Sequence, residues 1–206
     1  MGPGALAIAS NINSVLLGQV IAETTGTSLG GALRQELLNP LHLTTTRYAA
    51  EEPAHAVAGL TPVGNTIVNT SAIDPTSDIT SSGAAGAMVM SVPDMVTWGE
   101  AFLRDARVVT APLATTALHV APGGTGLGVL GFSETDGFCV FADGGCPAGA
   151  SFRAVGGSGV AAGTRSVLLY DRPRDSVVAL AINRDGTPGI EKFVVQVLRD
   201  IEAAEH

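Results

Sequence analysis

The sequence is poor in basic residues, and lysine is almost missing from it. Of its 206 residues only 11 are Lys or Arg, and Lys192 is the single lysine, against 19 acidic residues. The formal net charge is −8, and no basic run occurs anywhere in the chain. Nucleic acids and anionic membranes attract proteins through clusters of positive charge. We therefore expect neither nucleic acid nor an anionic membrane among the partners of this chain.

Long apolar runs and metal-binding patterns are missing as well. No stretch approaches the roughly 20 apolar residues of a membrane span, and the start, Met1–Gly4, lacks the positive region of a signal peptide. The four histidines are not paired at helical or turn spacing, so we expect no metal site and no cofactor. They are His42, His55, His119 and His206.

Charge of either sign and cysteine are both scarce. Charged residues make up 15% of the chain, against roughly 25% in ordinary soluble domains, and the mean hydropathy is +0.34. We expect some apolar surface that charge does not protect, which suits a partner or further chain.

Cys139 and Cys146 are separated by six residues that include Gly144 and Gly145. This spacing fits a hairpin disulfide, and it fits two isolated thiols equally well.

The length favours one domain over residues 1–206, because two domains would each be small. Apolar residues at helical spacing predict a helix, a glycine-containing turn and a second helix over 13–38. Residues 49–82 are rich in Thr, Ser, Pro, Asn and Gly and predict a long irregular excursion. Ser91–Asp94 is a favourable helix start, so a helix is expected over 95–103.

From about residue 121 the apolar pattern changes to that of strands. Short β-branched or aromatic runs bounded by Gly, Asp and Pro predict antiparallel strands at 127–132, 137–141, 151–155, 165–170 and 177–183. An apolar stripe over 188–203 predicts a last helix across the sheet. We expect a helical and loop region over roughly 1–120 and the sheet with its helix over 121–206. The fold class is α+β, an antiparallel sheet flanked by helices plus a helical region.

Several short motifs follow one another in an order typical of one enzyme family. They are Ser10-Asn11, Thr25–Leu29, Asn39–Thr46, Ser91–Met95 and Gly157–Gly159. In that order they resemble the motifs Tyr-Ser-Asn, TG-x-S-L, D-P-L-G-M-x-x-T, S-T-x-D-L and Lys/His-Thr/Ser-Gly of penicillin-recognising serine hydrolases, the family of class C β-lactamases and D-alanyl-D-alanine carboxypeptidases. The resemblance implies a β-lactamase/transpeptidase-like fold, of which this chain is the C-terminal portion. Proteins of the family usually work in the periplasm or are secreted.

The resemblance also implies acyl transfer by an activated serine, and the residues for that reaction are missing. The nucleophile of the family lies in a Ser-x-x-Lys turn. Lys192 is the only lysine, and Gly189 stands three positions before it, so the motif does not occur in this chain. Ala9 replaces the tyrosine that would relay a proton, and Gly157 replaces the Lys or His. We expect no catalytic residue here.

Other family positions keep groups that could bind a substrate. The predicted binding residues are Ser10, Asn11, Ser158, Gly159, Val160 and Arg165. The backbone N–H of Val160 stands where the resemblance places an oxyanion donor, and Arg165 could supply a cation for a carboxylate. Two of these residues have a structural alternative: Asn11 as a helix cap, and Arg165 as an exposed arginine at a sheet edge.

Three functions fit these residues. The first is a truncated or degenerate homologue without hydrolase activity of its own, which explains all the missing groups at once. The second is a β-lactamase, carboxypeptidase or esterase completed by an N-terminal segment or partner chain; Ala9 and Gly157 argue against it. The third is a non-catalytic module that holds a peptidoglycan-like peptide or a β-lactam in a residual cleft, or forms a homodimer through an exposed sheet edge.

Overall fold

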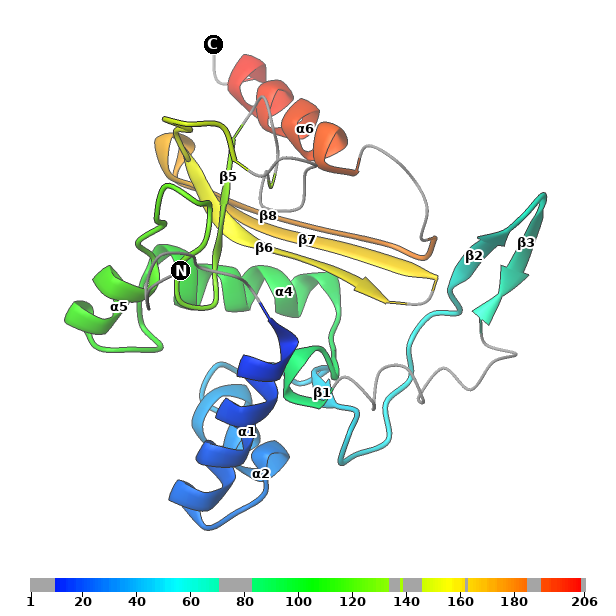
Figure 1. Cartoon of the computed structure of the whole chain (residues 1–206), viewed down its shortest axis with the longest axis vertical. Helices are drawn as coiled ribbons and strands as arrows, with labels where there is room; N and C mark the ends of the chain where they lie inside the picture. Colours follow the sequence, from blue (N-terminus) through cyan, green and yellow to red (C-terminus); the bar gives the residue numbers. More distant parts are fainter. Residues whose placement is uncertain are drawn as a thin grey trace, which may run out of the picture. The chain divides into compact units, whose positions relative to one another are not determined.

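Helices and antiparallel strands build the chain (Figure 1). The computed structural model describes residues 10–70, 83–133, 138, 146–161, 163–184 and 190–204. The chain divides into two units. The first unit comprises Met1–Thr97, Gly159–Arg165 and Ile182–Gly186, and the second comprises Trp98–Ser158, Ser166–Ala181 and Thr187–His206. The expectation of one domain stays a prediction.

The first unit begins with the predicted pair of helices. Helix α1 spans Asn11–Thr25 and α2 spans Leu29–Leu33, which continues as the π-helix η1, Arg34–Leu38. Gly26 ends α1 in the left-handed conformation, with φ of 66°. The Ser28 side chain caps α2 by accepting a hydrogen bond from the N–H of Gly31, the third residue of that helix, at 3.1 Å. The predicted helix, turn and helix are therefore confirmed.

Among the residues that the structure describes, helix α1 packs most closely along one strip around Gly18. A Cβ placed on Gly18 would lie 2.6 Å from the Cβ of Ala84 and 2.9 Å from Leu29, so the helix approaches its neighbours closely there. Away from that strip α1 presents apolar side chains that are each more than half exposed, at Ile12, Leu16, Leu17 and Val20. Part of the apolar surface expected from the composition thus lies on this helix.

A Schellman motif ends the second helical segment. The N–H of Leu43 donates to the carbonyl of Leu38 at 2.8 Å, and the N–H of His42 donates to the carbonyl of Asn39 at 3.0 Å. His42 takes the left-handed position of this motif, with φ of 56°. Glycine is the residue that usually occupies this position, because a side chain there crowds the backbone. The helix end therefore carries local strain.

Asp94 links the start of α4 (Val92–Gly99) to the segment after η1. Its buried carboxylate accepts hydrogen bonds from the N–H and the hydroxyl of Thr45, at 3.0 and 2.7 Å, and from the hydroxyl of Thr46, at 2.8 Å. Burial alone would raise the pKa of Asp94, but these hydrogen bonds outweigh it and hold the pKa below its usual value. The Ser91 hydroxyl accepts the N–H of Asp94 at 3.3 Å and so caps α4, as predicted.

Residues 49–82 contain regular structure that the sequence analysis did not predict. Strands β2 (Leu60–Val63) and β3 (Thr66–Asn69) form a hairpin, so the prediction of an irregular excursion is wrong for this part. Its strands include Thr, Val and Ile, but Pro and Asn interrupt the alternation that marks a strand. Residues 71–82 lie outside the described part. A further short antiparallel pair of strands in the first unit consists of β1 (Arg47–Tyr48) and β4 (Met88–Val89).

A four-stranded sheet forms the framework of the second unit. Residues Gly159–Arg165, which form the turn between its two middle strands and the adjoining strand ends, belong to the first unit. The strands run in the order β5 (Leu130–Phe132), β6 (Ala154–Ala161), β7 (Thr164–Asp171) and β8 (Ser176–Ile182). Four of the five predicted strands are thereby confirmed, with shifted ends. The strand predicted at 137–141 lies, except for Phe138, outside the described residues.

Helices accompany this sheet, as the α+β prediction requires. Helix α6 (Ile190–Ala204) lies beside the sheet (Figure 1) and buries Ile190, Val194 and Leu198, which confirms the predicted last helix. Gly99 at the end of α4 approaches the sheet so closely that a Cβ would lie 2.7 Å from Val177. The α4 helix continues as η4, Glu100–Arg104, and α5, Ala111–Ala117, follows without having been predicted.

A buried ion pair stabilises the end of β7. Asp171 is fully buried and accepts hydrogen bonds from Arg153 at 3.1 Å and from Arg174 at 2.6 Å. Arg174 also pairs with Glu202 of α6. Two guanidinium groups compensate the buried carboxylate, which limits the cost of removing it from water. The pairs connect β7, its following turn and α6.

Replacing Asp94 by Ala should lower the free energy of unfolding by about 2–4 kcal/mol, because three donors from Thr45 and Thr46 lose their acceptor. The lowered pKa implies that this stabilisation is present above about pH 4 and is lost as the pH falls through the folded-state pKa. Urea unfolding at pH 7 and pH 3 measures both effects. Asp200→Ala, on the exposed side of α6, is the control; equal losses for the two variants would contradict this role.

His42→Gly should raise the free energy of unfolding by about 0.5–1 kcal/mol, because glycine adopts the left-handed conformation without a steric penalty. The exposed imidazole loses no hydrogen bond in the described structure. Thermal unfolding with His42→Ala as the matched variant separates backbone strain from side-chain removal. A glycine variant no more stable than the alanine variant would show that the position is not strained.

Candidate functional site

Strand β6 carries four of the positions to which the family resemblance assigns a role. Gly157 and Ser158 are partly buried, and Gly159 and Val160 are exposed at the end of the strand. The Val160 side chain is 68% exposed. A β-strand sends successive side chains to opposite faces, so Ser158 and Val160 project on the same side of the sheet. The order and spacing expected for a substrate-binding strand are therefore present, but only short side chains and backbone groups stand on it.

Neighbouring glycines on β6 have opposite surroundings. A Cβ on Gly156 would lie 1.9 Å from the carbonyl oxygen of Leu168 on β7, so only glycine fits there. A Cβ on Gly157 would meet nothing within 4 Å. The missing Lys or His at Gly157 is therefore not a consequence of crowding, since the strand has room for a side chain.

The β6–β7 turn is fixed by backbone contacts within the first unit. Gly163 has φ of 75°, and a Cβ on it would lie 2.5 Å from the backbone of Gly59. The N–H of Leu60 donates to the carbonyl of Gly163 at 3.1 Å and to that of Asn183 at 2.9 Å. The turn is thus joined to the start of the β2–β3 hairpin. This contact could not be predicted from the sequence, because the hairpin itself was not predicted.

Ser10 and Asn11 stand at the start of α1. Ser10 occupies the N-cap position, and its carbonyl accepts the N–H of Asn13 at 3.1 Å, but its side chain makes no capping bond. Asn11 is the first residue of the helix and is exposed. The alternative interpretation, in which the Asn11 side chain caps the helix, is therefore wrong. Its amide is left available to a ligand.

Arg165 lies near the start of β7, which runs between β6 and β8. It is partly buried. The alternative interpretation as an exposed arginine at a sheet edge is therefore wrong, because β7 is an interior strand of the sheet. Arg165 follows the turn that joins β7 to the strand of Ser158.

The structure brings some predicted residues together. Gly159, Val160 and Arg165 flank one turn, directly after Ser158 in the chain. Within the described residues, neither Ser10 nor Asn11 makes a side-chain hydrogen bond to this group. A ligand contacting all six residues would have to bridge α1 and the β6–β7 turn, so these binding roles stay predictions.

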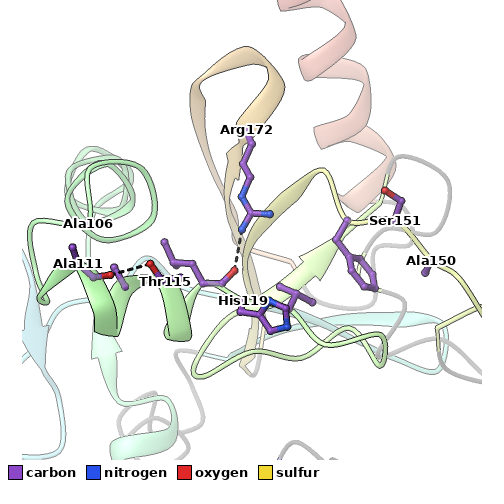
Figure 2. A pocket seen from close by; sticks show the side chains of 11 residues that line it. Ala106, Ala111, Thr115, His119, Ala150, Ser151 and Arg172 are labelled. Carbon is purple, nitrogen blue, oxygen red and sulfur yellow. Dashed lines mark hydrogen bonds between the residues drawn. The ribbon is translucent and has the colours of Figure 1, made fainter.

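An open pocket of about 720 Å³ lies elsewhere, within the second unit (Figure 2). Its polar lining side chains are Thr115, His119, Ser151 and Arg172, and none of the six predicted binding residues belongs to it. No motif in the sequence indicates this pocket, since α5 was not predicted and the other lining segments are connections.

Metal and redox features are few in the part of the chain that the structure describes. No group of three or more His, Cys, Asp or Glu residues suited to a metal occurs there. Cys146 is disulfide-bonded, which favours the disulfide over the isolated thiol; Cys139 lies outside the described residues. No helix among the described residues is long and apolar enough to cross a membrane.

Comparison with known proteins gives a family and a fold. The family model described as Beta-lactamase matches residues 3–201. No curated protein matches the chain significantly. A D-amino acid amidase from Ochrobactrum anthropi SV3, solved with L-phenylalanine amide, superposes with a TM-score of 0.77 at 21% identity, covering 100% of this chain and 60% of its own.

Two further structures agree. A D-stereospecific amidohydrolase from Streptomyces sp. has a TM-score of 0.70 and 22% identity over 90% of this chain and 52% of its own. An octameric penicillin-binding protein homologue from Pyrococcus abyssi has a TM-score of 0.70 and 18% identity over 96% of this chain and 44% of its own. The chain thus spans about half the length of these proteins. The predicted β-lactamase/transpeptidase-like fold is confirmed.

Gly157→Lys should fold with a free energy of unfolding within about 1 kcal/mol of the original, because the position is open, whereas Gly156→Ala should cost at least about 2 kcal/mol. The alanine Cβ would collide with the Leu168 carbonyl, and the strands would have to separate. Urea unfolding of the two variants measures the difference. Similar losses at both positions would refute the contrast between these two glycines.

Proposed function

Since the chain belongs to the β-lactamase family, we propose that it is a degenerate member of these serine hydrolases without independent hydrolase activity. The single observation that carries the proposal is the empty position at Gly157. The strand on which the family resemblance places a Lys or His is formed, and it has space for such a side chain. The chain nevertheless presents only hydrogen there, so the cation that the resemblance places at this position is missing.

The sequence supports the same conclusion at two other positions. Ala9 stands where the resemblance places the tyrosine that relays a proton, and a methyl group transfers none. Lys192 is the only lysine and is not preceded by a serine three residues earlier, so this chain contains no Ser-x-x-Lys nucleophile. The backbone N–H of Val160 could still serve as an oxyanion donor. Such a donor without a nucleophile accelerates acyl transfer little.

The groups that are left are suited to binding. Under this proposal Ser158 and the Val160 N–H offer hydrogen bonds to a peptide-like carbonyl, and Arg165 offers charge to a carboxylate. Ser10 and Asn11 would add hydrogen bonds from the start of α1. A peptidoglycan-like peptide, a β-lactam or an amino acid amide has the required combination of amide and carbonyl groups.

One observation favours a second candidate, in which another polypeptide completes the hydrolase. Helix α1 exposes apolar side chains at Ile12, Leu16, Leu17 and Val20, and such a surface is typical of a protein interface. The edge strand β8, which pairs only with β7 among the described strands, could likewise support a homodimer. The octameric homologue shows that self-association occurs with this fold. A completing chain would still have to replace the groups missing at Ala9 and Gly157.

The purified chain should form no covalent adduct with a fluorescent penicillin or a fluorophosphonate, because no serine is activated by a neighbouring base. Intact-mass spectrometry after incubation measures this directly. An active class C β-lactamase treated in parallel is the positive control, and the heat-denatured chain reports non-specific labelling. A stoichiometric adduct on one serine of the folded chain would overturn the proposal.

A further inference from the structure

The open pocket in the second unit has the size of a site for a small molecule. Its volume of about 720 Å³ falls within the roughly 300–1,000 Å³ typical of ligand pockets. Residues of α5 line one side, where Ala111 and Thr115 stand in Figure 2, and Ala150 and Ser151 line the opposite side. Arg172, in the turn between β7 and β8, and His119 lie between these walls.

Arg172 supplies positive charge that no carboxylate of the described residues neutralises. Its Nη2 donates to the carbonyl oxygen of Leu118 at 2.9 Å, which holds the guanidinium at the pocket. The neighbouring arginines at 153 and 174 are both paired with Asp171, but Arg172 forms no ion pair within the described part of the chain. The other N–H groups of its guanidinium are therefore available to an anion.

Acidic side chains are missing from the lining. None of the described residues that line the pocket is Asp or Glu, although acidic residues outnumber basic ones by 19 to 11 in the whole chain. The His119 ring and the Ser151 hydroxyl can each donate a hydrogen bond. Thr115 donates its hydroxyl to the carbonyl of Ala111 at 3.0 Å and keeps its lone pairs for a ligand. Every polar side chain of this pocket can thus contact a carboxylate or the polar atoms beside it.

The remaining lining is apolar. Leu118, Val120 and Phe152 provide aliphatic and aromatic surface, and alanines leave space between the walls. Apolar walls with a few convergent polar groups are the usual composition of a ligand site. An inorganic anion would leave most of this surface in contact with water. A ligand that fits has one anionic end and an apolar body.

We propose that this pocket binds a small organic monocarboxylate with an aromatic or aliphatic body. The carboxylate accepts hydrogen bonds from the Arg172 guanidinium, and the body packs against Phe152 and Leu118. A planar guanidinium is the side chain best suited to a carboxylate, because two parallel N–H groups match its two oxygens. The site is separate from the residues of the proposed function and does not depend on that proposal.

Phenylacetate is the probe, since it joins a carboxylate to one aromatic ring. Isothermal titration of the full chain should give a Kd of about 1 mM, as expected for so small a ligand.

Arg172→Gln should weaken binding at least about 10-fold, because a charge-assisted hydrogen bond is lost. Arg199→Gln removes the same charge from an exposed position on α6 outside the pocket and should change the Kd less than about 2-fold. Phenylacetamide, the neutral isostere, should bind at least about 10-fold more weakly than phenylacetate.

Ala111→Phe provides an independent test if the Arg172 variant does not fold. Ala111 is exposed at the start of α5 and lines the pocket, so a phenyl group there should fill space and abolish phenylacetate binding without lowering the melting temperature. Three outcomes would overturn the proposal: no phenylacetate binding to the original chain, equal weakening by Arg172→Gln and Arg199→Gln, or full binding by Ala111→Phe.

Discussion

Three hydrogen bonds to the buried Asp94 carboxylate hold the segment of Thr45 and Thr46 against the start of α4. Much of the first unit depends on this contact. Thr45 follows the helical pair and Asp94 lies in the first turn of α4, so the carboxylate joins two segments whose contacting residues are 49 positions apart in the chain. Both residues belong to motifs that resemble the β-lactamase family, and here their chemistry is structural.

The sequence predicted those parts of the fold whose periodicity is regular. The last helix follows from a regular apolar stripe, and the turn at Gly26 and the start of α4 at Ser91 follow from caps. Helix α1 was also predicted, although its apolar residues do not gather on one buried face. It did not predict the β2–β3 hairpin, since backbone contacts to Gly163 anchor its start and leave little trace in residue types. The seven-residue helix α5 was missed for a similar reason, because it buries only Ala114.

The candidate sites divide in the same way. Motif spacing placed Ser158, Gly159 and Val160 on one strand, and the structure shows that strand. The same motifs could not reveal that Gly157 is open while Gly156 is closed by Leu168, since that difference depends on the neighbouring strand. The pocket at Arg172 had no motif at all. It is formed by α5 and by connections that meet it only in three dimensions, and the polar groups are proposed to bind a carboxylate without implying any reaction.

Under the proposed function, the chain keeps the strand and helix framework of the hydrolase fold without the reacting side chains, and it should bind substrates without turning them over. The most direct measurement is the steady-state hydrolysis of a chromogenic cephalosporin and of a D-amino acid amide at high concentrations of the purified chain. The account predicts rates no greater than those of buffer at every substrate concentration. A saturable rate that disappears in the Ser158→Ala variant would contradict it, because hydrolysis would then depend on a group that the proposal treats as a binding residue.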